Sequence, residues 1–167
     1  MKEFFKSLAD DLGLDFSQKL IPRKYTVSGK FRGHSIVINT KNREKRWTDI
    51  EFIQIYARLK NPKDVDFALI EQTAVSKAGK DTNKLDVLVD NPKFDGKYLI
   101  RCLYKKDAKK ILTENIIDKI LTYNEFNLQI IEGKAFMELS AKLANKERIK
   151  SKINVFLDII ENIDSLS

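Results

Sequence analysis

The chain has 167 residues and a net formal charge of +7, with 43% hydrophobic and 33% charged residues. This length is typical of one domain, and the composition excludes an intrinsically disordered chain. No apolar run approaches the ~20 residues that a membrane span requires. Charged residues also interrupt the first turn, where a signal peptide would be apolar. We therefore expect a single globular domain over residues 1–167, cytoplasmic and without a membrane span.

The order of the predicted elements indicates an α+β fold. Apolar residues at helical spacing predict an N-terminal helix over residues 2–12, a middle helix over about 105–121 bent near Thr113, and a long C-terminal helix over about 145–163. Alternating apolar residues between turns predict about six to seven strands, drawn from 25–31, 34–39, 47–59, the segment after 61, 85–89, 97–103, 126–131 and 134–139. Because βαβ alternation is absent, the sheet should be mainly antiparallel, with the helices on one face.

Two segments of the chain open alike, at Asn61-Pro62 and at Asn91-Pro92. An internal duplication would explain the similarity. The simpler interpretation is that Asn-Pro is a common turn opening and that both turns lead into strands.

The sequence lacks the motifs of the best-known catalytic and cofactor sites. Gly-Lys pairs occur, but none has the second glycine or the following Ser or Thr of a phosphate-binding loop, and no Gly-x-Gly-x-x-Gly run exists. Structural zinc needs about four Cys and His ligands, whereas Cys102 and His34 are the single residues of their kinds. We expect Cys102 to be a buried inert thiol and His34 to have a structural or surface role. No catalytic residue, cofactor or metal is therefore assigned.

The basic residues are concentrated in one segment. Residues 19–46 contain nine Lys and Arg residues against one Glu, a net charge of +8, so the rest of the chain is nearly neutral. A polyanion would be contacted here through Arg23, Lys24, Lys30, Arg32, Arg43, Lys45 and Arg46. The same charge could instead meet an anionic membrane surface.

These observations leave three functions open. The first is a non-enzymatic binding or protein-interaction module, whose partner would be another protein, or a second copy of the chain, held through an apolar patch. The alternative is a binder of nucleic acid or another polyanion through residues 19–46. The third is an enzyme with a site built from scattered carboxylates and tyrosines. A basic, cytoplasmic α+β binding module is the interpretation that we carry forward.

A resemblance supports the architecture. Residues 91–100, with Pro92-Lys93-Phe94-Asp95 before an alternating strand, are followed by Ala108-Lys109-Lys110-Ile111-Leu112-Thr113. This order, together with the hairpin over 126–139 and the closing helix, resembles a widespread group of uncharacterised prokaryotic proteins. That group has no established activity, so the resemblance implies a fold and assigns no site residue.

Overall fold

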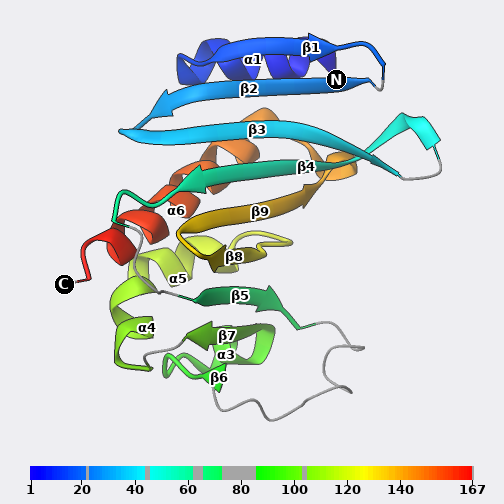
Figure 1. Ribbon diagram of the computed structural model, residues 1–167. Helices are drawn as coiled ribbons and strands as arrows, with labels where there is room; N and C mark the ends of the chain where they lie inside the picture. The colour runs from blue at the N-terminus through cyan, green and yellow to red at the C-terminus, as the bar shows by residue number, and fades with distance from the viewer. Residues whose placement is uncertain (22, 44–45, 62–65, 73–85, 103–104, 167) are drawn as a thin grey trace.

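Nine antiparallel strands form one sheet in the order β1-β2-β3-β4-β9-β8-β5-β7-β6 (Figure 1). The computed structural model describes residues 1–21, 23–43, 46–61, 66–72, 86–102 and 105–166. The strands are β1 (Asp15–Lys19), β2 (Lys24–Phe31), β3 (His34–Arg43), β4 (Arg46–Arg58), β5 (Phe67–Glu71), β6 (Asp86–Val87), β7 (Tyr98–Cys102), β8 (Leu128–Ile131) and β9 (Lys134–Ser140). The α+β class and the antiparallel sheet are confirmed, but the sheet has more strands than the six to seven predicted.

The helices pack together on one face of this sheet. They are α1 (Lys2–Leu12), α3 (Pro92–Lys97), α4 (Lys105–Ile111), α5 (Glu114–Leu121), the single-turn 3₁₀ helix η1 (Ala141–Leu143) and α6 (Lys146–Asp164). Figure 1 shows α6 crossing behind β3, β4 and β9, where it also contacts α1, α4 and α5. The N-terminal and long C-terminal helices are thus confirmed.

Strand alternation divides the sheet into a buried face and an open face. Ile36 and Ile38 of β3, and Ile53 and Ile55 of β4, point toward the helices and are fully buried. The residues between them point the other way, because successive side chains of a strand alternate between faces. Tyr56, on this other face, is among the exposed large hydrophobic residues. No helix of the described ranges lies on that open face, so it is the broad surface available to a partner.

Local sequence explains where the elements differ from the prediction. Residues 91–97 were expected to form a turn, but Pro92 opens the short helix α3, because the Asn91 side chain accepts a hydrogen bond from the Phe94 N–H at 3.1 Å. The expected middle helix is two helices, α4 and α5, and Thr113 is the N-cap residue of the second. Strand β1 was not predicted, because Phe16 is its only apolar residue.

Candidate functional site

The short strand β8 leaves a notch in the sheet. β8 begins at Leu128, which pairs with Met137 of β9 and with Leu69 of β5. Both neighbouring strands continue beyond these pairs, β9 to Ser140 and β5 to Glu71. Their facing backbone groups therefore lack a strand partner in this stretch, and buried backbone donors without partners are costly.

Two side chains from the segment before β8 close this notch. The Glu125 carboxylate accepts a hydrogen bond from the Ser140 N–H at 2.8 Å, and the Asn127 side-chain oxygen accepts one from the Glu71 N–H at 2.8 Å. A strand would have used its backbone for this pairing. Here two side chains accept these backbone hydrogen bonds, so polar groups lie in the middle of the sheet. A hollow lies on each face of the sheet at this point.

On the open face the notch widens into an apolar groove of about 340 Å³. We call it the groove; its lining residues are Phe52, Leu69, Ile70, Glu125, Asn127, Leu128, Gln129, Phe136, Glu138 and Ser140. The aromatic surface continues past its edge, since the rings of Phe136 and Tyr56 pack 5.1 Å apart. The groove thus offers a row of partly exposed apolar side chains to a partner.

The charge of the groove is negative. Its two ionisable lining residues are Glu125 and Glu138, and none of the described lining residues is cationic. Glu138 accepts a hydrogen bond from the Gln54 side chain at 2.9 Å and lies 3.7 Å from the Lys41 ammonium. The two ionisable residues that line the groove are thus carboxylates, with the Lys41 ammonium beside one of them, on a protein whose net charge is positive.

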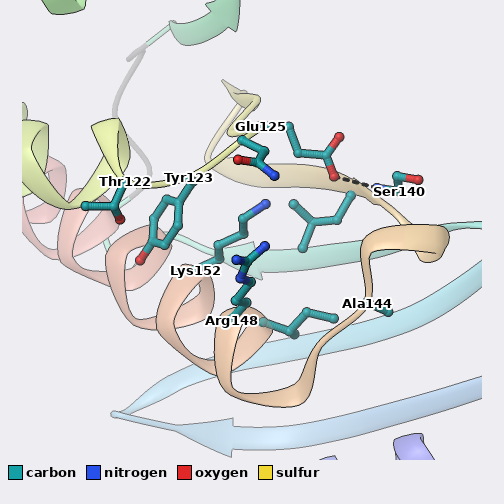
Figure 2. A pocket seen from close by; sticks show the side chains of 10 residues that line it. Thr122, Tyr123, Glu125, Ser140, Ala144, Arg148 and Lys152 are labelled. Atoms are coloured by element: carbon teal, nitrogen blue, oxygen red, sulfur yellow. Dashed lines mark hydrogen bonds between the residues drawn. The ribbon is translucent and has the colours of Figure 1, made fainter.

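On the helix side the notch meets a small cavity of about 30 Å³ (Figure 2). Glu125 and Ser140 line this cavity as well as the groove, so the two lie against each other across the sheet. Figure 2 shows Lys152 and Arg148, from successive turns of α6, both extending toward the segment that carries Glu125. We call this the cation cavity.

Lys152 is the unusual residue of the cation cavity. It is only 7% exposed. Burial lowers the pKa of its ammonium, and the positive charges of Arg148 and Lys97 lower it further, while the Glu125 and Glu71 carboxylates act in the opposite direction. Its ammonium lies 5.6 Å from the centre of the Tyr123 ring. A desolvated ammonium beside a second cation is suited to hold a carboxylate or phosphate oxygen.

Tyr98 is a second buried polar residue on the same side of the sheet. It is 2% exposed, and its hydroxyl is buried with no hydrogen-bond partner among the described residues. Burial raises the pKa of this phenol, and the Glu71 and Glu125 carboxylates raise it further. The hydroxyl therefore stays protonated and can only serve as a neutral donor or acceptor.

The predicted polyanion residues are divided between two ends of the sheet. Arg23 and Lys24 are exposed at the start of β2. Arg43 ends β3 and pairs with Arg46, the first residue of β4, so these two belong to the same end of the sheet as Arg23 and Lys24. Lys45 falls outside the described residues. The structure thus brings four of the seven predicted residues to one end.

The other two, Lys30 and Arg32, lie at the opposite end, beside the turn between β2 and β3. Arg32 forms ion pairs at 2.7 Å with Asp158 and with Glu161 of α6. The same Glu161 carboxylate lies 3.7 Å from Nε2 of His34, which is buried. Arg32 therefore joins the β2–β3 hairpin to the C-terminal helix, and His34 is buried beside this ion pair.

Sequence reasoning missed the notch, although one signal was present. Lys152 lies three residues after Ile149 and four before Phe156, so it occupies the apolar face of the predicted helix. A cation at such a position is buried, or its side chain must reach past the core. Glu125 and Tyr98 gave no comparable signal, because only the tertiary structure places them beside Lys152. Cys102 is buried, as expected.

Comparison with known proteins gives one similarity, in fold. No family model and no curated protein matches the chain. The crystal structure of the mycobacterial trehalose monomycolate transport factor A, TtfA, is similar with a TM-score of 0.63 and 13% sequence identity. The similarity covers 97% of this chain and 93% of that one. At this identity the similarity shows a shared fold alone.

The described residues also bear on metal binding and on membrane insertion. Within the described ranges, no group of His, Cys, Asp and Glu residues is placed to hold a metal ion. No helix in those ranges is long and apolar enough to cross a bilayer.

Proposed function

We propose that this protein is a non-enzymatic binding module that docks a partner protein in the groove on its open sheet face. The observation that carries the proposal is the groove itself, an apolar hollow of about 340 Å³ on a sheet face that no described helix covers. Phe52, Ile70 and Phe136 are partly exposed in this hollow, and an occupant would remove their apolar surface from water. The groove also lies over a notch where the regular strand pairing is replaced by side chains, so its shape is specific to this sequence.

Charge and shape select the class of partner. The groove is lined by residues of the four neighbouring strands β4, β9, β8 and β5, and a hollow that spans several strands can take an extended segment. The Glu125 and Glu138 carboxylates favour lysine or arginine beside the apolar side chains, because complementary charges steer and orient association. The occupant is therefore an extended protein segment in which apolar and basic residues alternate.

The structural comparison agrees with a role of this kind. The neighbour TtfA is named as a transport factor, and a role in binding rather than catalysis is our own proposal for this chain. Trehalose monomycolate transport is named for TtfA, and we do not extend it to this chain.

Binding of model peptides tests the proposal. Fluorescein-labelled Lys-Val-Lys-Phe-Lys-Val-Lys and its counterpart with Glu in place of every Lys would be titrated with the protein while fluorescence anisotropy is measured. The basic peptide should bind, and Phe136→Ser should weaken this binding by about tenfold, since one aromatic contact contributes about 1.5 kcal/mol. Leu88→Ser, which removes an exposed apolar side chain directly after β6 and outside the groove, is the matched control.

Two results would refute the proposal. One is equal binding of the basic and acidic peptides with no effect of Phe136→Ser. The other is a concentration-dependent dimer in sedimentation equilibrium that Phe136→Ser dissociates, because the groove would then be an interface between copies of the chain.

A second candidate function rests on the buried ammonium of Lys152. The cation cavity, with Arg148 beside Lys152, would take a carboxylate group of a small ligand or of the partner. An NMR titration with acetate, followed at the Lys152 side chain, should shift that signal in the wild type and leave the Arg148→Gln variant less responsive. No shift at acetate concentrations that saturate exposed lysines would remove this candidate.

A further inference from the structure

The turn between β1 and β2 exposes two aliphatic side chains at one end of the sheet. Leu20 is 73% exposed and Ile21 is 85% exposed, the highest values among the large hydrophobic residues that the structure describes. β1 is an edge strand of the sheet, so this turn lies at a corner of the sheet (Figure 1). Nothing in the fold requires aliphatic side chains at this position, since neither contributes to the core.

Cations surround these two side chains. Lys19 ends β1 and pairs directly with Lys24, which begins β2. Arg23 lies in the turn itself and is exposed. Within the described part of the chain, none of the three forms an ion pair, so their charges are available to a partner. Two adjacent aliphatic side chains are thus flanked by three exposed cations.

The neighbouring hairpin extends this positive end. The end of β3 and the start of β4 lie at the same end of the sheet, because β2 begins where β3 ends. Arg43 and Arg46 are paired register positions there, and Lys41 is exposed on β3. The charge that the sequence concentrates in residues 19–46 therefore gathers mainly beside Leu20 and Ile21.

We propose that this end of the sheet docks on an anionic lipid bilayer, with Leu20 and Ile21 inserted among the acyl chains and Lys19, Arg23 and Lys24 on the lipid phosphates. Aliphatic side chains bordered by basic residues match the boundary between the acyl and headgroup regions. A nucleic acid fits less well, because it would be held by aromatic rings that stack on bases, whereas Tyr25, the nearest aromatic of β2, is buried. The groove lies on the open face of strands β4, β9, β8 and β5, so a bilayer at this end leaves it accessible.

Co-sedimentation with sucrose-loaded vesicles tests the proposal. The probes are vesicles of phosphatidylcholine alone and of phosphatidylcholine with about 30 mol% phosphatidylglycerol. The full chain should bind the anionic vesicles at least about tenfold more tightly than the neutral ones, and added salt should weaken binding. The double variant Leu20→Ser/Ile21→Ser should bind the anionic vesicles about a hundredfold more weakly, because each of the two inserted side chains contributes a transfer free energy worth about a factor of ten.

The controls separate insertion from charge and from misfolding. Arg23→Glu/Lys24→Glu should abolish binding to the anionic vesicles, whereas Leu88→Ser, another exposed aliphatic substitution, should leave it unchanged. Circular dichroism should show the same fold for every variant, because the substituted side chains lie outside the core. Equal vesicle binding by wild type and Leu20→Ser/Ile21→Ser would overturn the proposal. So would binding to heparin, but not to vesicles, which would make this end a site for soluble polyanions.

Discussion

Replacing Lys152 with methionine should stabilise the protein. The variant keeps the length of the side chain of Lys152, a residue that is 7% exposed, and removes an ammonium for which the structure gives no hydrogen-bond partner among the described residues. It loses the attraction of the ammonium to the Tyr123 ring at 5.6 Å, worth about 0.5–2 kcal/mol, and to the Glu125 and Glu71 carboxylates, but it removes the cost of burial that outweighs these attractions in the lowered pKa. We expect a net gain of about 1 kcal/mol, which raises Tm by about 2–4 °C for a domain of this size.

The cost of burying the Lys152 ammonium depends on pH. Because the folded-state pKa of Lys152 is lowered, the unfolded chain binds more protons between that pKa and the ordinary value of about 10.4. The penalty is therefore complete at neutral pH and disappears as the pH rises toward about 10. The difference in Tm between Lys152→Met and wild type should shrink over this range.

Lys150→Met is the matched control, two residues away on α6. Lys150 lies 3.1 Å from the Asp11 carboxylate, and hydrogen bonding to it raises the Lys150 pKa. Stability from this residue is present at neutral pH and is lost as the pH rises through its raised pKa. Lys150→Met should therefore lower Tm at neutral pH. Thermal denaturation followed by circular dichroism measures both variants, and a Lys152→Met protein less stable than wild type, or a difference independent of pH, would refute the reasoning.

Three further substitutions test separate parts of the structure by urea denaturation. Arg32→Met should lower the free energy of unfolding by about 1–2 kcal/mol, because it leaves the Asp158 and Glu161 carboxylates without their shared guanidinium; a change below about 0.3 kcal/mol would contradict this. Asn91→Ala should cost about 1 kcal/mol through loss of the N-cap of α3, and an unchanged midpoint would contradict that cap. Tyr98→Phe should be neutral or stabilising by up to about 1 kcal/mol, since it deletes an unpaired buried hydroxyl; destabilisation would reveal a partner for that hydroxyl.

The fold was predictable wherever the pattern of burial is local. Ile149, Ile153, Phe156 and Ile160 recur at helical spacing, and α6 buries all four. β1 escaped prediction because an edge strand with one apolar side chain is held by its pairing with β2, which the local sequence does not encode. α3 was missed for a different reason, since an Asn-Pro pair opens both turns and helices.

The groove and the cation cavity could not be predicted from the sequence. They arise because β8 is shorter than β9 and β5, and the length of a strand relative to its neighbours is a tertiary property. The basic segment, in contrast, was visible in the sequence. Its division between two ends of the sheet was not, because Arg32 looks like Arg23 until α6 supplies Asp158 and Glu161.

Mapping the binding surface by NMR tests the central claim most directly. Backbone ¹⁵N–¹H spectra of the labelled protein would be recorded while the basic peptide Lys-Val-Lys-Phe-Lys-Val-Lys is added. Docking in the groove predicts shift changes concentrated at Phe52, Ile70, Gln129, Phe136 and Glu138, with β1, β2 and α1 unaffected. Shift changes confined to the helical face, or none at peptide concentrations of about 1 mM, a weak limit for a specific contact, would contradict the account.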